Sequence, residues 1–316
     1  MASGILIDGR WEVRPYKADA AGRFERQKTL FRSRVGEGDF PLEEGRYRLY
    51  VSYACPWAHR TMIARALLGL ESAIPMSVVH PHMLEQSWEF RDDDGRTCPE
   101  PVFDAEALWQ VYARAEPGVS GRVTVPVLLD TVAKRIVNNE SREIVRMFGR
   151  AFRPYARNSD VDLCPPGMQD EIEAVIDALY EPVNNGVYRA GFARSQAAYE
   201  EAARGLFAAL EHWDGVLGRR RWLCGDVLTE ADIALFTTLL RFDPVYYVHF
   251  KCSLKHIWDY PNLWRFLRRL YHHPAVQPTI RLDHIVQHYF VSHPHINPSG
   301  LVPIGPVIDY GEPPRD

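Results

Sequence analysis

A strand that runs directly into a helix, with a cysteine at the junction, most constrains how this chain can fold. Residues 46–54 are rich in side chains that favour strands, and Leu49 and Val51 fall on one face. Residues 55–70 then carry apolar side chains at helical spacing, with Pro56 in the first turn, where a missing N–H costs nothing. This junction predicts an α/β unit in which Cys55 begins a helix.

The residues after this helix predict the remainder of a thioredoxin-like fold. Apolar runs predict three more strands and a final helix, while the polar stretch between the second and third strands is interpreted as an inserted loop. The strand–helix–strand, strand–strand–helix order is the split arrangement of that fold. These strands are expected at 76–80, 123–130 and 135–139, the helix at 140–148 and the loop at 81–122. Pro126 interrupts a predicted strand, and a cis Val125–Pro126 bond would account for its position.

The second half of the chain has helical periodicity almost throughout, so the fold class is α/β followed by all-α. Thr229 and Asp232 have capping-box spacing at the start of one of these helices. The expected segments are an irregular N-terminal extension (1–44), a thioredoxin-like domain (45–150), a linker (151–167), a helical domain (168–290) and an extended C-terminal tail (291–316).

Composition and charge exclude several classes of protein. The formal net charge of −4 provides no electrostatic reason to expect nucleic acid. No apolar run approaches the roughly 20 residues that cross a bilayer, and the N-terminus lacks a signal-peptide core, so a cytoplasmic protein without membrane contact is expected. The five cysteines are odd in number and form no CxxC pair, which argues against a disulfide framework or a four-cysteine zinc site.

One of these cysteines is placed for reactivity. The sulfur of Cys55 would face the free N–H groups of a first helical turn, which stabilise a thiolate, and the thiolate is the nucleophilic form. Position 58 is alanine, so no neighbouring thiol can close an internal disulfide. A single-cysteine site of this kind requires an external thiol, of which glutathione is the abundant example. A buried structural cysteine is the alternative at this stage.

Several motifs resemble those of one family over nearly all of residues 46–306. CPWAHR at 55–60, NNESREI at 138–144 and FDPVY at 242–246 are together specific for the glutathionyl-hydroquinone reductases, the xi class of glutathione transferases. The resemblance implies a thioredoxin-like domain joined to an all-helical domain, in a homodimer. It also implies that glutathione reduces an aromatic S-glutathionyl-hydroquinone through a mixed disulfide at Cys55.

The resemblance assigns glutathione-binding residues in the first half. Glu140 would accept from the γ-glutamyl amine, and Ser141 with the helix N–H groups would hold the carboxylate. The backbone of Val125 would pair with the cysteinyl part, as an added strand does. The other residues assigned to glutathione are Trp88, Arg122, Val123 and Thr124.

Three tyrosines are implied to surround the acceptor ring. Tyr188 would be the proton donor, while Tyr246 and Tyr289 would hydrogen-bond the departing hydroquinone or the thiolate; a one-place error toward Tyr247 is open. His59 is assigned no base role. The C-terminal histidines at 284, 288, 293 and 295 lack an accompanying metal motif, so no metal is expected.

Two other functions remain open. An omega-like thiol transferase or dehydroascorbate reductase would use the same cysteine chemistry on another acceptor. A non-catalytic binding protein on a transferase fold could dispense with Cys55 or the glutathione pocket, whereas Cys55, Glu140 and Ser141 are all present. The physiological hydroquinone, and a catabolic as opposed to a general quinone-repair role, do not follow from sequence.

Overall fold

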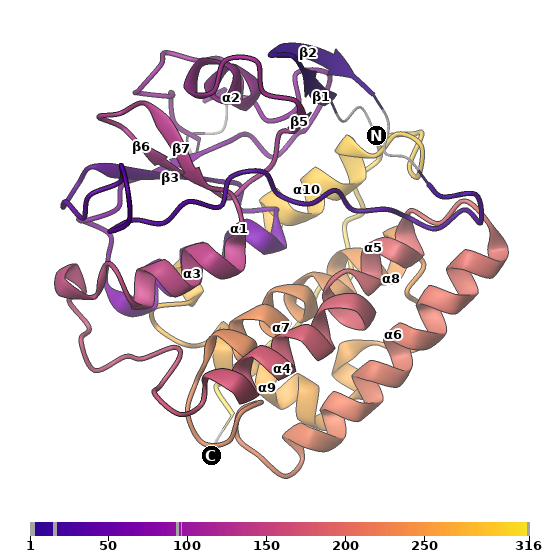
Figure 1. Cartoon of the computed structure of the whole chain (residues 1–316). Helices are drawn as coiled ribbons and strands as arrows, with labels where there is room; N and C mark the ends of the chain where they lie inside the picture. Colours follow the sequence, from indigo (N-terminus) through magenta and orange to yellow (C-terminus); the bar gives the residue numbers. More distant parts are fainter. Residues whose placement is uncertain (1–3, 15–17, 93–94, 96, 315–316) are drawn as a thin grey trace. The chain divides into compact units, whose positions relative to one another are not determined.

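The computed structural model describes residues 4–14, 18–92, 95 and 97–314 and divides into two compact units, whose elements are labelled in Figure 1. The extreme ends of the expected N-terminal extension and C-terminal tail (1–3 and 315–316), and residues 15–17, lie outside the described residues. The first unit comprises the described residues of 1–16, 27–161 and 281–302. The second comprises those of 17–26, 162–280 and 303–316.

A four-stranded mixed sheet forms the centre of the first unit, in the order β4-β3-β6-β7. β3 (Tyr47–Val51) runs parallel to β4 (Met76–Val78) and antiparallel to β6 (Val127–Asp130), which pairs with β7 (Arg135–Asn138). Every residue of β6 is buried, as expected for a central strand whose two faces are both covered. The predicted strand at 123–130 is therefore shorter than expected, because it begins only after the cis Val125–Pro126 bond, which is confirmed.

Helices cover both faces of this sheet (Figure 1). α1 (Pro56–Leu68) packs against α3 (Ser141–Gly149), and α1 ends at Gly69, whose positive φ of 67° suits a glycine cap. α2 (Leu108–Ala115) lies on the opposite face, within residues that were predicted to be loop. That prediction was wrong at α2, because two turns are too short for helical periodicity to stand out among polar neighbours.

The N-terminal extension was predicted to be irregular, but part of it forms strands. β1 (Gly4–Ile7) and β2 (Arg10–Val13) form a hairpin, and β5 (Gly121–Arg122) pairs with β1 to give a second sheet. Asp8 and Gly9 have positive φ values of 48° and 75°, as a two-residue hairpin turn requires. The Asp-Gly pair was therefore a sequence signal for this hairpin.

The second unit is helical, as predicted. Two of its helices continue into π-helical turns that contain a proline, which cannot donate the regular helical hydrogen bond. Its longer helices are α4 (Gln169–Leu179), α6 (Gln196–Leu217), α7 (Glu230–Arg241) and α9 (Pro261–Tyr271). Its shorter elements are the π-turns Tyr180–Asn184 and Phe242–Tyr246, α5 (Gly186–Gly191), α8 (Tyr247–His249), and 3₁₀ turns at Ile257–Asp259 and Gln277–Thr279. The first unit adds a 3₁₀ turn at Arg153–Tyr155.

The last helix, α10 (Leu282–Ser292), groups with the first unit, although the sequence placed most of it in the helical segment 168–290. His288 lies with Nδ1 2.7 Å from the carbonyl oxygen of Pro81, and the Ser292 hydroxyl accepts from the N–H of Met83. These contacts join segments more than 200 residues apart, so helical periodicity could not reveal them.

Candidate active site

Cys55 occupies the N-cap of α1, between the end of β3 and the first helical turn. Its backbone is extended, with φ −76° and ψ 121°, and its carbonyl accepts from the N–H of His59 at 2.9 Å. The side chain is half-buried, and Sγ lies 3.6 Å from the carbonyl oxygen of Val125. The structure thus brings together the predicted nucleophile and the backbone predicted to bind the cysteinyl part of glutathione.

A buried tyrosine holds the backbone beside Val125. The Tyr112 hydroxyl donates to the carbonyl of Thr124 at 2.8 Å and accepts from its N–H at 3.4 Å. The same hydroxyl accepts from Nδ2 of Asn139 at 3.3 Å. Tyr112 therefore connects the segment Val123–Val125 to the residue that precedes Glu140.

Glu140 caps α3, as its predicted position at the helix start requires. Its carboxylate accepts from the N–H of Arg142 at 3.3 Å and from the hydroxyl of Thr29 at 3.2 Å. Ser141 is buried, and its hydroxyl donates to the same carboxylate at 3.5 Å. This carboxylate and the first turn of α3 place an acceptor next to N–H groups, which suits a ligand end carrying both an amine and a carboxylate.

The N-terminal extension supports this corner of the sheet. Phe31 donates its N–H to Oδ1 of Asn139, and the N–H of Asn139 donates to the carbonyl of Phe31. Arg32 forms a bidentate ion pair with Glu143, at 2.5 and 2.7 Å. That pair, although Glu143 is partly buried, holds the pKa of the Glu143 carboxyl below its usual range. Sequence reasoning missed these contacts because they join residues more than 100 positions apart.

Trp88 and Arg122 have well-defined partners within the first unit. Trp88 is buried and stacks on His288 with ring centres 4.9 Å apart, and its backbone carbonyl accepts from the N–H of Leu108 at the start of α2. Nη1 of Arg122 donates to the carbonyls of Gly4 and Arg14, at 3.3 and 2.7 Å. Their packing therefore ties the N-terminal hairpin and α10 to the predicted glutathione region.

Tyr289 lies on α10 in the first unit and is buried. His284, five residues earlier on the same helix, packs edge-on against Tyr53, which precedes Cys55 by two residues. His59 is buried within α1. Among the described residues, no group of three or more histidine, cysteine or acidic side chains lies close enough to hold a metal ion.

The other two predicted tyrosines belong to the second unit and lie together. The ring centres of Tyr188, on α5, and Tyr246, at the end of a π-turn, are 6.1 Å apart. Phe250 packs against both, stacking on Tyr246 at 5.3 Å. Tyr247, the alternative to Tyr246, stacks on His256 at 3.6 Å. Tyr246 is therefore the one of the two that shares an aromatic cluster with Tyr188.

Arg26 lies over the ring of Tyr188 and was not singled out in the sequence. Its guanidinium carbon is 4.7 Å from the ring centre, and Nε donates to Oδ1 of Asn185 at 2.9 Å. Asn184 anchors the same loop by donating to the carbonyl of Ala234 on α7. The NNGVY motif at 184–188 therefore positions the tyrosine through both of its asparagines.

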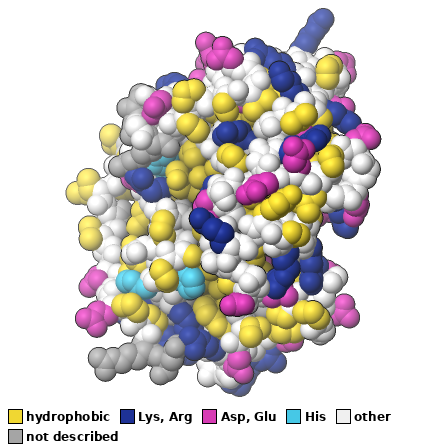
Figure 2. All heavy atoms as spheres, turned by 90° about the vertical axis from the view of Figure 1, so that its left-hand side faces the viewer, with side chains coloured by type: hydrophobic (Ala, Val, Ile, Leu, Met, Phe, Trp, Pro, Cys, Tyr) yellow, Lys and Arg dark blue, Asp and Glu magenta, His cyan; other side chains and the backbone are white. Residues whose placement is uncertain are grey.

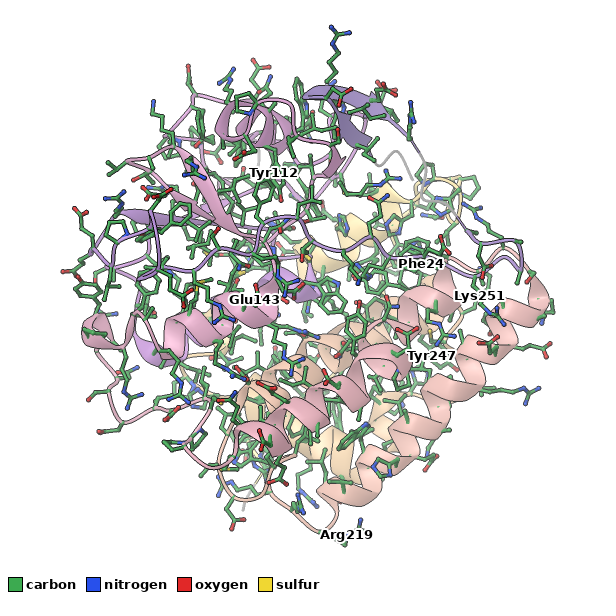
Figure 3. All side chains as sticks on the ribbon, in the orientation of Figure 1. Phe24, Tyr112, Glu143, Arg219, Tyr247 and Lys251 are labelled. Atoms are coloured by element: carbon green, nitrogen blue, oxygen red, sulfur yellow. The ribbon has the colours of Figure 1, made fainter. Side chains whose placement is uncertain are left out.

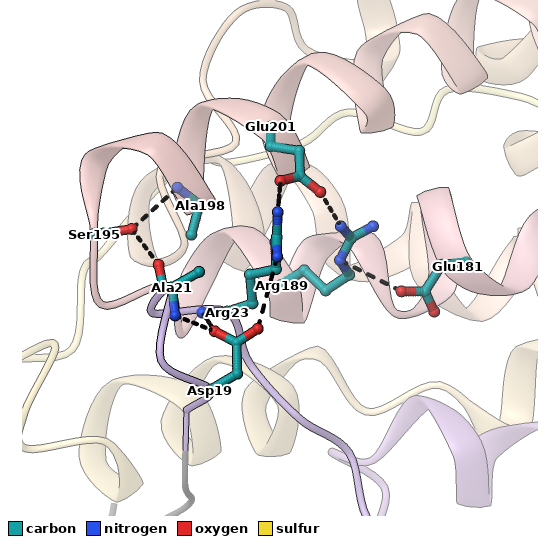
Figure 4. Close-up of polar contacts among 8 residues, drawn as sticks. All are labelled: Asp19, Ala21, Arg23, Glu181, Arg189, Ser195, Ala198 and Glu201. Atoms are coloured by element: carbon teal, nitrogen blue, oxygen red, sulfur yellow. Dashed lines mark hydrogen bonds and ion pairs between the residues drawn. The ribbon is translucent and has the colours of Figure 1, made fainter.

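A polar network fixes the segment that carries Arg26 (Figure 4). Arg23 donates twice to Oε2 of Glu201, and Arg189 donates to the other oxygen of that carboxylate at 3.0 Å. Ser195 caps α6 by accepting from Ala198, and its hydroxyl donates to the carbonyl of Ala21 at 2.8 Å. Residues 18–26 are thus held on the helical unit by side chains of α5 and α6.

The remaining thiols lack the position of Cys55. Burial raises the pKa of the Cys224 thiol to about 11 and raises the pKa of Cys252 further. Cys164 is also buried, and Sγ of Cys98 accepts from the N–H of Val78. No disulfide joins any two of the five cysteines.

Two further observations bear on partners. On the face shown in Figure 2, basic and acidic side chains are interspersed and do not gather into a patch of one sign. No helix in the described part of the chain combines the length and apolar character needed to span a membrane.

A thioredoxin-like sheet with a thiol at a helix start, followed by an all-helical unit, defines a glutathione transferase. The family model "Glutathione S-transferase, N-terminal domain" matches residues 54–151, and "Glutathione S-transferase, C-terminal domain" matches residues 196–269. The predicted fold class is therefore confirmed.

The full-length relatives narrow the class. The chain is 48% identical to glutathionyl-hydroquinone reductase YqjG of Escherichia coli, covering 98% of this chain and 97% of that protein; its glutathione-bound structure superposes with a TM-score of 0.88. A Xi-class transferase structure from Natrialba magadii, 49% identical, covers 99% of this chain and 96% of its own, with a TM-score of 0.92. Glutathione S-transferase omega-like 2 of Schizosaccharomyces pombe is 45% identical over 90% of this chain and 94% of its own. The chain belongs to the glutathionyl-hydroquinone reductases, the Xi class of glutathione transferases.

Proposed function

We propose that this enzyme reduces S-glutathionyl-hydroquinones to hydroquinones with glutathione as reductant. The observation that carries the proposal is the placement of Cys55 at the N-terminus of α1, with Sγ 3.6 Å from the Val125 carbonyl. The first-turn N–H groups favour the thiolate, and Ala58 leaves no second thiol in the motif. The enzyme therefore relies on glutathione itself to complete the cycle.

The reaction takes two steps, cleavage of the thioether and then thiol–disulfide exchange. The Cys55 thiolate attacks the thioether sulfur of the conjugate, the aryl carbon–sulfur bond breaks, and the ring carbon takes the electron pair and a proton from Tyr188. Hydroquinone leaves, and Cys55 remains joined to glutathione by a disulfide. A second glutathione gives up its thiol proton, which restores the Tyr188 phenol, and its thiolate attacks this disulfide to produce oxidised glutathione and free Cys55. Each turnover thus converts one conjugate and one glutathione into hydroquinone and glutathione disulfide.

The tripeptide binds at the edge of the central sheet where β3 and β7 end and β6 begins. The Val125 carbonyl faces the Cys55 thiol, which no longer donates to it once the thiol is ionised or has formed a disulfide. The carbonyl then accepts from the cysteinyl N–H of glutathione. Glu140 accepts from the γ-glutamyl amine, and Ser141 with the first turn of α3 holds the adjoining carboxylate. Val123, Thr124, Trp88 and Arg122 complete the glutathione-binding residues in this proposal.

Tyr188, Tyr246 and Tyr289 serve the aromatic acceptor. The first two share one aromatic cluster in the second unit, which suits a flat, apolar ring that also needs a hydroxyl partner. Tyr289 belongs to the first unit and is assigned a hydrogen bond to the departing hydroquinone.

An omega-like thiol transferase or dehydroascorbate reductase is the second candidate, supported by the omega-like name of the fission-yeast relative. It would use Cys55 and glutathione in the same way on another acceptor. Parallel assays with a glutathionyl-hydroquinone and with dehydroascorbate separate the two, since the proposal requires a kcat/KM higher for the former.

Mass spectrometry of the intact protein tests the central step. After incubation with a glutathionyl-hydroquinone and no free glutathione, we expect one glutathione on Cys55 and stoichiometric release of hydroquinone. Cys55→Ser should abolish both, and Cys98→Ser, which changes another partly exposed thiol, should retain both. Full turnover by Cys55→Ser would overturn the proposed chemistry.

The proposal extends to the assembly and the compartment. We infer a homodimer, as the family resemblance implies, and a cytoplasmic protein, since five cysteines without a disulfide suit a reducing compartment. Cell fractionation with an antibody to the native chain would test the location, and recovery in an oxidising compartment would contradict it.

A further inference from the structure

Tyr112 makes every hydrogen bond that one phenol can make with this set of partners. It lies on α2, is 1% exposed, and its hydroxyl donates to the Thr124 carbonyl while accepting from the Thr124 N–H and from Nδ2 of Asn139. A phenol has one proton to donate and two lone pairs, so these three contacts saturate it. Burial raises the pKa of Tyr112, which keeps the hydroxyl protonated as a donor.

The partners of this hydroxyl adjoin both halves of the proposed glutathione site. Thr124 directly precedes Val125, whose backbone is assigned to the cysteinyl part, and Asn139 directly precedes Glu140, which is assigned to the γ-glutamyl end. Asn139 is held from its other side, because Oδ1 accepts from the N–H of Phe31. The Phe31 ring also packs edge-on against the Tyr112 ring, at 5.7 Å.

We propose that Tyr112 is a positioning residue that sets the separation and orientation of the two backbone segments that bind glutathione. The inference rests on the proposed function, and Tyr112 acts through Thr124 and Asn139 without contacting the tripeptide. Two segments held in their bound geometry lose less conformational freedom when the ligand binds, so the hydroxyl contributes to affinity through preorganisation. The amine-binding end and the cysteinyl-binding end are thereby coupled through one oxygen.

Tyr112→Phe removes this oxygen and keeps the ring. Isothermal titration with glutathione, below the unfolding temperature of every variant, should show affinity weakened about tenfold, equivalent to about 1.4 kcal/mol. The KM for glutathione should rise by a similar factor, and kcat at saturating glutathione should change less than threefold.

Tyr47→Phe is the matched control. Tyr47 is a fully buried tyrosine of the same unit that packs edge-on against Phe152, and its hydroxyl donates to the Pro41 carbonyl, away from the predicted glutathione residues. A comparable loss of thermal stability with unchanged glutathione affinity is expected for this variant. If both variants weakened glutathione binding equally, Tyr112 would only stabilise the fold in general, and the inference would be overturned.

Asn139→Asp supplies a second test, alone and combined with Tyr112→Phe. It keeps the acceptor for Phe31 but replaces the donor to Tyr112 by an acceptor, so two acceptors compete for one phenolic proton. Glutathione binding by Asn139→Asp should weaken. The double variant with Tyr112→Phe should lose less affinity than the sum of the two single losses, because removing the Tyr112 hydroxyl ends the competition. Strict additivity would contradict the proposed link.

The wild-type titration separates the two levels of inference. Absence of glutathione binding by the wild-type protein would overturn the proposed function itself. Wild-type binding, together with a Tyr112→Phe affinity within twofold of it, would overturn the positioning role alone.

Discussion

At the scale of single residues, the side chains predicted to react contact charged and polar residues that are distant in sequence. Arg26 illustrates this, since its guanidinium lies over the Tyr188 ring while Nε is held by Asn185. A cation over an aromatic face contributes about 0.5–2 kcal/mol. In the proposed reaction Tyr188 gives up a proton to the departing ring and gains negative charge, which the positive charge of Arg26 would stabilise.

Arg26→Gln should therefore lower kcat about fivefold, because Gln retains a donor for Asn185 but carries no charge. The KM for glutathione should remain unchanged, since the residues assigned to glutathione lie in the first unit. Steady-state kinetics with a glutathionyl-hydroquinone measures both values. Arg135→Gln, which removes a cation 5.3 Å from the Phe40 ring in the first unit, is the control expected to match wild type. An unaltered kcat for Arg26→Gln would argue against this role.

At the scale of elements, side-chain hydrogen bonds fix where α7 begins. The carboxylate of Asp232 accepts from the N–H and hydroxyl of Thr229, at 2.8 and 2.9 Å, and from the N–H of Leu223 at 2.8 Å. The capping box predicted at α7 is thus confirmed, and the same carboxylate also fixes the preceding loop. Burial is the dominant effect and raises the pKa of Asp232 to about 6, although the three hydrogen bonds act in the opposite direction.

The sign of this pKa change predicts how stability depends on pH. The folded-state pKa of Asp232 lies above its ordinary value of 3.8, so the stability contributed by protonated Asp232 is fully present below about pH 4 and is lost as pH rises through 6. Asp232→Asn cannot titrate, so the unfolding free energy of wild type minus that of the variant should fall between pH 4 and pH 7. Denaturant unfolding at each pH measures it, with exposed Asp226→Asn as the control. A difference that rises with pH would contradict the prediction.

At the scale of the whole molecule, the N-terminal extension serves both units. Residues 18–26 are pinned to α5 and α6 by the network of Figure 4 and present Arg26 to Tyr188. A few residues later, Thr29 donates to Glu140 and Phe31 pairs with Asn139, within the first unit. The extension thus supports residues assigned to the acceptor and residues assigned to glutathione. Tyr112 on α2, labelled in Figure 3, also supports the glutathione residues through its hydrogen bond with Asn139.

The homodimer is the prediction at this scale. Size-exclusion chromatography with light scattering should give a mass of about twice the 36.3 kDa of the chain. A dilution series from micromolar to nanomolar concentration distinguishes a stable dimer from a weak one. A mass of one chain at every concentration would rule out the dimer.

The sequence by itself determined the features that depend on neighbours along the chain. The strand–helix junction at Cys55, the helix start at Glu140, the proline break at Pro126 and the capping box at Asp232 all follow from short-range backbone chemistry. The Asp8–Gly9 turn is also a short-range signal, but the hairpin it forms was not predicted. The eight-residue α2 was missed because it is too short for its helical periodicity to be recognised.

Only the tertiary structure decided which distant residues support the site. Arg26 over Tyr188, Phe31 on Asn139 and the Tyr112 hydroxyl between two backbone segments are contacts across long separations in sequence. Helical or strand periodicity reports which face of an element is buried, but it carries no information about which residue it meets there. Hydrogen-bond partners are selected when the chain packs, because each buried donor and acceptor must then find a partner among the groups that packing brings near.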